Sequence, residues 1–174
     1  MALTDRHSEL QSLTKFKRAQ IAQLKNGVRI ELICADTIAN LLLSAAADRF
    51  TMARSFLSDA MRIRRVRPAM ERSSISRSYY GMYHGARALA FLSLEGDDNE
   101  GHNELHKGLP EDFPDVEQWR NALKDARLRR NEADYDPYPV GESEFAVIGR
   151  TQIGIVTNFL NETESYLRAR GCPL

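Results

Sequence analysis

Long apolar runs, paired cysteines and strand-like segments are all scarce in this sequence, and each scarcity narrows the choice of fold. No window approaches twenty uninterrupted apolar residues, which argues against a transmembrane helix. Cys34 and Cys172 are the only cysteines and belong to no Cys-x-x-Cys or Cys/His ligand spacing. We therefore read both as free thiols in a reducing compartment. Alternating segments rich in Val, Ile and Thr are absent, so nothing predicts a β-strand.

The signatures of several protein classes are missing as well. The segment Met1–Arg6 lacks the basic-then-apolar order of a secretory signal, so we expect a cytoplasmic protein with no membrane partner. There is no glycine-rich phosphate loop and no Gly-x-Ser-x-Gly elbow. His102 and His106 lie one helical turn apart, but Asn103 stands where the metalloprotease signature has glutamate, and no third ligand is evident. We therefore expect neither a metal nor a cofactor.

What the sequence does contain is a globular composition with segregated charge. Its 174 residues are 43% hydrophobic and 28% charged, which suits one soluble domain with a real core. The net charge is zero, yet the segment from Arg49 to Arg87 contains nine arginines and only two acidic residues, a net charge of +7. The segment from Glu95 to Gln118 contains nine acidic residues and one lysine, a net charge of −8. Such asymmetry has two readings: the basic segment forms a surface that binds phosphates, or the basic and acidic segments attract each other within the fold.

Apolar spacing and turn signals predict helices throughout. A polar first helix should stop at Asn26-Gly27, and the long run from Val28 to Val66 is either one helix or a kinked pair. The expected helical segments span residues 4–27, 28–66, 71–94, 100–108, 115–136 and 141–170. We expect an all-α, up-and-down bundle of about five helices with an extra N-terminal helix. The corresponding parts are an N-terminal helical appendage (1–27), the bundle (28–170) and a tail (171–174).

Arg130 occupies an unusual place in this pattern. Steps of three and four residues connect it to an apolar line on one helix face, formed by Val116, Trp119, Leu123, Ala126 and Ala133. A guanidinium on a core-facing line needs a partner, and Asp134 lies one turn on, although arginine before aspartate is the weaker orientation for such a pair. Two readings remain open: a structural ion pair, or a contact to phosphate.

The segment 71–94 carries two stripes. The predicted core face consists of Ile75, Tyr79, Met82, Tyr83, Ala86, Leu89 and Ala90. Beside it runs a polar line of Arg77, Tyr80, His84 and Arg87, also at helical spacing. Three serines (73, 74 and 76) offer caps at the start of this helix.

Three blocks in order, at 76–89, 106–109 and 130–136, resemble the HEPN domain family of prokaryotes. The resemblance covers roughly residues 35 to 166. It implies a helical bundle that pairs into a homodimer, with the arginine-bearing helices of both subunits meeting at a shared cleft. Many members of the family are metal-independent endoribonucleases, often the toxin half of a toxin–antitoxin pair whose other half is a small nucleotidyltransferase.

The ribonuclease motif of this family is incomplete here. In active members an arginine, usually followed by a polar residue, precedes a histidine by four to six positions, and Arg130 and Asn131 match that start. Five positions after Arg130 stands Tyr135, flanked by Asp134 and Asp136. The chain is therefore similar to a subgroup with Arg-Asn-x-Ala-Asp-Tyr, which leaves open whether it is an enzyme.

Metal-independent RNA cleavage needs a base, an acid and a cation. Arg130 can be the cation, and His84 is the candidate for the missing proton-transfer group. The candidate catalytic residues are Arg130, Asn131, Asp134, Tyr135 and His84, and the candidate ligand-binding residues are Arg77, Tyr80, Arg87 and Arg127. The expected function is binding of RNA or a nucleotide, with or without cleavage, in a toxin–antitoxin or stress module. The alternative is a catalytically silent assembly module that partners a nucleotidyltransferase.

Overall fold

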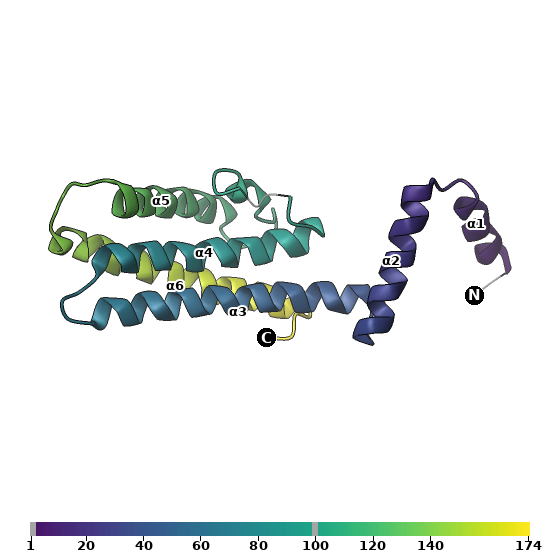
Figure 1. Cartoon of the computed structure of the whole chain (residues 1–174), viewed down its shortest axis with the longest axis horizontal. Helices are drawn as coiled ribbons and strands as arrows, with labels where there is room; N and C mark the ends of the chain where they lie inside the picture. Colours follow the sequence, from purple (N-terminus) through teal and green to yellow (C-terminus); the bar gives the residue numbers. More distant parts are fainter. Residues whose placement is uncertain (1–2, 99–100) are drawn as a thin grey trace. The chain divides into compact units, whose positions relative to one another are not determined.

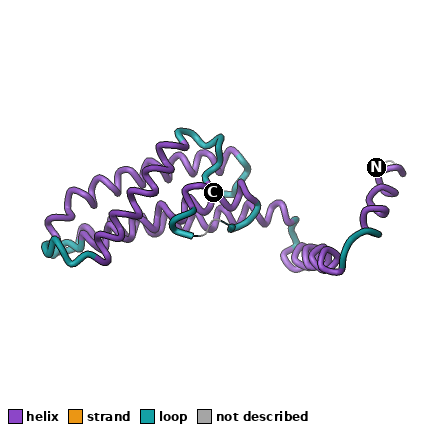
Figure 2. The backbone as a smooth tube through the Cα atoms, turned by 90° about the horizontal axis from the view of Figure 1, so that it is seen from above, coloured by secondary structure: helices purple, strands orange, loops and turns teal. Residues whose placement is uncertain are grey.

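The computed structural model describes residues 3–98 and 101–174, and over these residues its secondary structure consists of helices joined by loops, with no strand (Figures 1 and 2). The α-helices are α1 (Leu3–Leu13), α2 (Arg18–Cys34), α3 (Ile38–Arg65), α4 (Glu71–Leu94), α5 (Val116–Tyr135) and α6 (Ala146–Ala169), with 3-10 turns η1 (Leu105–Gly108) and η2 (Glu142–Phe145). The predicted all-α class is confirmed. No single described helix is long and apolar enough to cross a membrane; only α2 and α3, taken together across the break between them, pass that test of length and composition.

The chain forms two compact units, residues 1–41 and 42–174. In the first unit, α2 begins after Lys17, whose backbone N–H donates to the Gln20 side chain (2.9 Å). The predicted stop at Gly27 is wrong, because α2 continues through it; a glycine inside a helix costs only about 1 kcal/mol. The break comes at Ala35, which adopts a left-handed φ of 52°, so the run predicted from Val28 to Val66 belongs to two helices.

In the second unit α4 is the central helix, and α5 and α6 both pack against it. Its predicted core face is buried at all seven positions: Ile75, Tyr79, Met82, Tyr83, Ala86, Leu89 and Ala90. Gly85 lets α6 approach closely, because a Cβ there would lie 2.5 Å from Leu160 Cδ2 and 3.1 Å from Phe159 Cε1. The start of α4 lies beside the C-terminal end of α5, since Arg72 donates to the Ala133 carbonyl and Ser76 to Asp134.

Some local expectations are corrected. The short helix expected at 100–108 is reduced to the 3-10 turn η1, and residue 100 lies outside the described residues. Met70 precedes α4 without a side-chain cap. The expected serine caps are used elsewhere, since Ser74 donates to the Ala60 carbonyl and Ser76 to Asp134.

Candidate functional site

Arg130 is buried, with 8% of its surface exposed, as its place on the apolar line of α5 predicts. Its Nη1 donates to Asn131 Oδ1 and to the Tyr135 hydroxyl, both at 3.1 Å. Its Nε is buried and has no hydrogen-bond partner in the described part of the chain. A buried guanidinium with an unsatisfied N–H is costly, so this side chain is under-coordinated for its environment.

Asp134 does not complete the coordination of Arg130. The distance from Arg130 Nε to Asp134 Oδ2 is 3.7 Å, which is within range of an ion pair but too long for a hydrogen bond. The same carboxylate oxygen accepts a hydrogen bond from Ser76 Oγ at 3.1 Å instead. Asp134 is therefore held by α4 as well as by its own helix, and Arg130 has a carboxylate nearby without a bond to it.

Three tyrosine rings surround the Arg130 cation. The guanidinium carbon lies 5.3 Å from the ring centre of Tyr79, 5.6 Å from that of Tyr80 and 5.6 Å from that of Tyr135. These are cation–π distances, and the partners come from two helices, α4 and α5. Arg130 is thus held by rings and neutral oxygens, and Asp134, at ion-pair distance, is not hydrogen-bonded to it.

His102 joins this cluster from the segment after α4, and the sequence reasoning missed it there. The Tyr79 hydroxyl and His102 Nδ1 are 2.6 Å apart, and the His102 ring stacks on Tyr83 at 4.3 Å. Burial raises the pKa of the Tyr79 phenol, and burial followed by the charges of Arg130 and Arg127 lowers the pKa of His102. No periodicity links His102 to Tyr79, 23 residues away, so only the fold reveals this contact.

His102 and His106 were the weak metal candidates of the sequence. Among the residues that the structure describes, no group of three or more His, Cys, Asp or Glu side chains could hold a metal ion.

A pocket of about 500 Å³ lies beside the Arg130 cluster. Arg130 is not one of its lining residues, but two of them lie next to Arg130: the Tyr80 ring at 5.6 Å and Asp134 at 3.7 Å. The other lining residues are Phe56, Ser73, Ser76, Arg77 and His84. Arg77 lies over the Phe56 ring at 5.4 Å. The pocket therefore combines aromatic surface, hydroxyls and a guanidinium that none of the described carboxylates pairs.

His84 lines this pocket in a neutral state. It stacks on Phe56 with ring centres 5.2 Å apart, and its buried Nδ1 has no partner among the described residues. Burial, and then the charges of Arg87 and Arg49, lower the pKa of His84 to about 4. At neutral pH the ring is uncharged and a weak base, which does not suit the proton-transfer role expected of it.

The structure gathers most of the predicted site residues but not all of them. Arg130, Asn131, Asp134 and Tyr135 form one cluster, and Arg77, Tyr80 and His84 share the adjoining pocket with Asp134. Arg87 does not line this pocket: its Nε donates to Asp97 Oδ1 at 3.1 Å and its Nη1 to the Tyr83 hydroxyl at 3.3 Å. Arg127 is half-buried on α5 and acts on the cluster through its charge near Tyr79 and His102.

A scan of the sequence against protein-family models finds no match, and a search of curated proteins finds none either. The site is accordingly interpreted from its own geometry.

Proposed function

We propose that the protein binds single-stranded RNA or a nucleotide in the pocket beside Arg130. The observation that carries this proposal is the state of Arg130 itself: a buried cation whose Nε has no hydrogen-bond partner among the described residues and whose nearest described carboxylate lies 3.7 Å away. Arginine binds phosphate through its planar fork of N–H donors, and those donors are incompletely used here.

The surroundings of Arg130 suit the rest of a nucleotide. Tyr80 and the stacked pair of Phe56 and His84 offer aromatic faces of the kind on which unpaired bases stack. Tyr135 is 71% exposed at the end of α5 and adds a further ring. Ser73, Ser76 and Arg77 supply polar groups in the same pocket. A ligand with both a base and a phosphate matches this combination better than an apolar metabolite does.

The geometry favours binding over cleavage. Tyr135 stands where the ribonuclease motif of the HEPN family has histidine, and the pKa of His84 is lowered to about 4. His102, which hydrogen-bonds to Tyr79 beside Arg130, also has a pKa lowered by burial and by the Arg130 charge, so it is no better suited to proton transfer. We therefore propose a HEPN-like homodimer that binds RNA or a nucleotide, with a silent module that partners a nucleotidyltransferase as the second candidate.

The test is a titration of labelled single-stranded RNA, and separately of ATP, into the wild-type protein and Arg130→Lys. Lysine keeps the charge but loses the fork, so we expect at least fivefold weaker binding by Arg130→Lys. The same samples, incubated with RNA in EDTA, report cleavage. A wild-type protein that binds neither RNA nor ATP contradicts the proposal, and one that binds RNA without cutting it supports binding without cleavage.

A further inference from the structure

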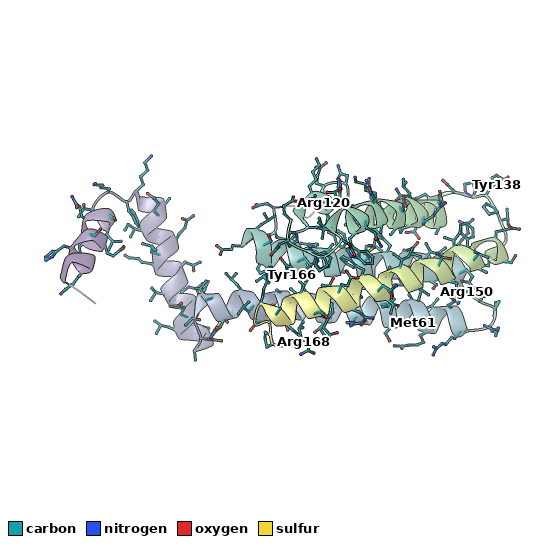
Figure 3. All side chains as sticks on the ribbon, turned by 180° about the vertical axis from the view of Figure 1, so that it is seen from behind. Met61, Arg120, Tyr138, Arg150, Tyr166 and Arg168 are labelled. Atoms are coloured by element: carbon teal, nitrogen blue, oxygen red, sulfur yellow. The ribbon has the colours of Figure 1, made fainter. Side chains whose placement is uncertain are left out.

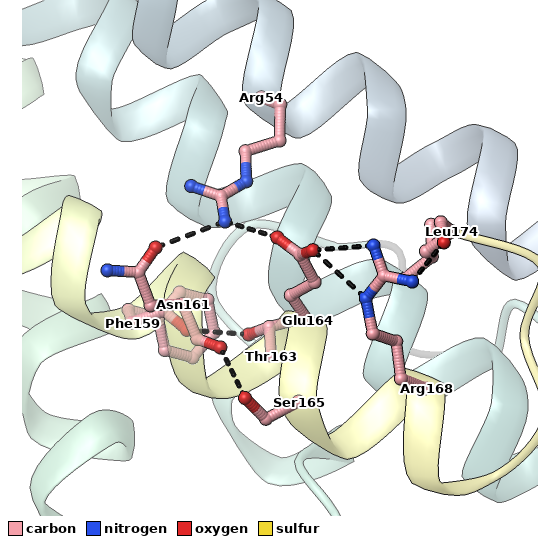
Figure 4. Close-up of polar contacts among 8 residues, drawn as sticks. All are labelled: Arg54, Phe159, Asn161, Thr163, Glu164, Ser165, Arg168 and Leu174. Atoms are coloured by element: carbon pink, nitrogen blue, oxygen red, sulfur yellow. Dashed lines mark hydrogen bonds and ion pairs between the residues drawn. The ribbon is translucent and has the colours of Figure 1, made fainter.

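Pairing with carboxylates divides the arginines of residues 42–174 into two groups. Arg54 and Arg168 illustrate the first group, since both donate to Glu164 on α6 (Figure 4). Arg65, Arg67 and Arg150 belong to the second, because none of the described carboxylates lies within 4 Å of their guanidinium nitrogens. Arginines without a partner are ordinary when scattered over a surface, but these three are not scattered.

Arg65, Arg67 and Arg150 line a single pocket together with Arg64. The pocket has a volume of about 570 Å³ and lies between the end of α3 and the first turns of α6. Figure 3 labels Arg150 on α6 and Met61 on α3, two residues that line it. This pocket shares no lining residue with the one beside Arg130, so it is a separate site.

The one acid in the lining is already engaged. Glu71 is 5% exposed, and its Oε2 lies 3.0 Å from Arg64 Nε. Arg64 also donates from Nη2 to the Ala146 carbonyl at 3.4 Å. Gly149 permits this arrangement, since a Cβ there would lie 2.9 Å from Glu71 Oε2. Glu71 and Arg64 neutralise each other in this ion pair. None of the described carboxylates compensates the charge of the other three arginines.

Part of the arginine cluster is also preorganised. Arg67 Nη1 donates to the backbone carbonyls of Arg65 and Val66, at 3.2 and 3.0 Å, which folds its side chain back over the end of α3. Like charges held together in a concave site raise the local potential and attract anions. The structure of this segment therefore concentrates positive charge where no described acid neutralises it.

We propose that this arginine pocket is an anion site that binds clustered phosphate groups, from the backbone of a single-stranded RNA or from the phosphate tail of a free nucleotide. Its lining contains no aromatic ring, so it offers no stacking surface for a base, in contrast to the pocket beside Arg130. Guanidinium groups without carboxylate partners are the groups that bind phosphate bidentately. Its volume lies within the roughly 300–1,000 Å³ of ordinary ligand pockets.

The test compares two double variants that change the net charge equally. Arg65→Gln/Arg150→Gln removes two arginines of the pocket, and Arg54→Gln/Arg168→Gln removes two paired arginines of the Glu164 network. With inorganic tripolyphosphate we expect the melting temperature to rise for the wild type and the control, and to stay unchanged for Arg65→Gln/Arg150→Gln. An equal rise in both double variants, or none in the wild type, overturns the proposal.

A second arm uses labelled RNA without terminal phosphates and distinguishes the two sources of phosphate. Here the inference rests on the proposed RNA binding. We expect Arg65→Gln/Arg150→Gln to bind at least fivefold more weakly, with a salt dependence smaller by about 1.4 in the log–log slope, at about 0.7 per lost contact to a single strand. If the wild type binds no RNA while tripolyphosphate stabilises it through Arg65 and Arg150, the proposed RNA binding fails and the pocket stands as a site for free polyphosphate.

Discussion

Glu164 and Asp134 each lie next to arginines, but the arginines hydrogen-bond to Glu164 and not to Asp134. Arg54, half-buried on α3, and Arg168, exposed on α6, lie 2.5 and 2.8 Å from Glu164 oxygens (Figure 4). Arg130 is far more deeply buried, but its nearest contact to Asp134 is 3.7 Å and its hydrogen bonds go to neutral oxygens. The two more exposed arginines hydrogen-bond to a carboxylate, and the buried one does not.

Under our proposal, this difference separates arginines that stabilise the fold locally from one that meets a ligand. An exposed ion pair contributes little and needs no function beyond solubility. A buried cation enclosed by tyrosines is costly when no carboxylate hydrogen-bonds to it, so its retention calls for another reason. The predictions below test whether that reason is phosphate binding.

Truncating Arg130 should have the largest effect on stability. Arg130→Ala removes the side chain that contacts Tyr79, Tyr80 and Tyr135, and we expect a loss of about 2 kcal/mol in the free energy of unfolding. Arg130→Met, which fills the space without a charge, should stay within about 1 kcal/mol of the wild type. Urea unfolding measures both. An Arg130→Ala protein as stable as the wild type would show that the tyrosine contacts contribute nothing.

Acid should affect the two regions in different pH windows. Burial lowers the pKa of His84 to about 4, so between pH 6.5 and 4 the unfolded chain binds a proton that the folded chain does not, and stability falls as pH falls. We expect a loss of about 1–2 kcal/mol over this window, allowing for the half-buried ring. Hydrogen bonds from Arg54 and Arg168 lower the pKa of Glu164, so its stabilisation is present above the ordinary carboxylate pKa and is lost only at more acid pH.

The matched variants for the pH experiment are His84→Phe and Glu164→Gln. Unfolding curves measured at intervals from pH 7 to 3 give the free energy of unfolding as a function of pH. In His84→Phe this free energy should depend less on pH between 6.5 and 4, and in Glu164→Gln it should depend less on pH only at the acid end. A His84→Phe protein with the full wild-type slope between pH 6.5 and 4 would assign the proton uptake to other groups.

Removing the Glu164 carboxylate should destabilise the fold slightly without changing ligand binding. Glu164→Gln leaves Arg54 and Arg168 without their shared partner, and we expect a loss of about 0.5–1 kcal/mol at neutral pH. Chemical denaturation gives the stability, and RNA titration should return the wild-type affinity. A marked loss of RNA binding would place the ligand near α6 rather than at Arg130.

Removing the Asp134 carboxylate should have the smallest effect, and one of opposite sign. Asp134→Asn keeps the shape and leaves an acceptor for Ser76, but removes a negative charge beside the proposed phosphate. We expect RNA affinity to rise by about threefold, or about 0.65 kcal/mol. Weaker binding by Asp134→Asn in the anisotropy titration would mean that Asp134 itself contacts the ligand.

The sequence alone predicts those features of the site that depend on spacing within a single helix. The burial of Arg130 and the core face of α4 follow from spacing along a single helix. The tyrosine enclosure, the Ser76–Asp134 hydrogen bond and the arrival of His102 at Tyr79 depend on packing between segments, which periodicity does not encode. Arg87 shows the converse: helical spacing put it with the ligand-binding residues, but Asp97, in the loop after α4, binds it.

The salt dependence of RNA binding tests most directly whether Arg130 meets a phosphate. Affinities for one labelled single-stranded RNA, measured from about 50 to 200 mM salt, give the log–log slope for the wild type, Arg130→Met and Arg54→Met. We predict that Arg130→Met lowers the slope by about 0.7, the value for one phosphate contact to a single strand, and that Arg54→Met leaves it unchanged. Equal slopes for the wild type and Arg130→Met would contradict the account.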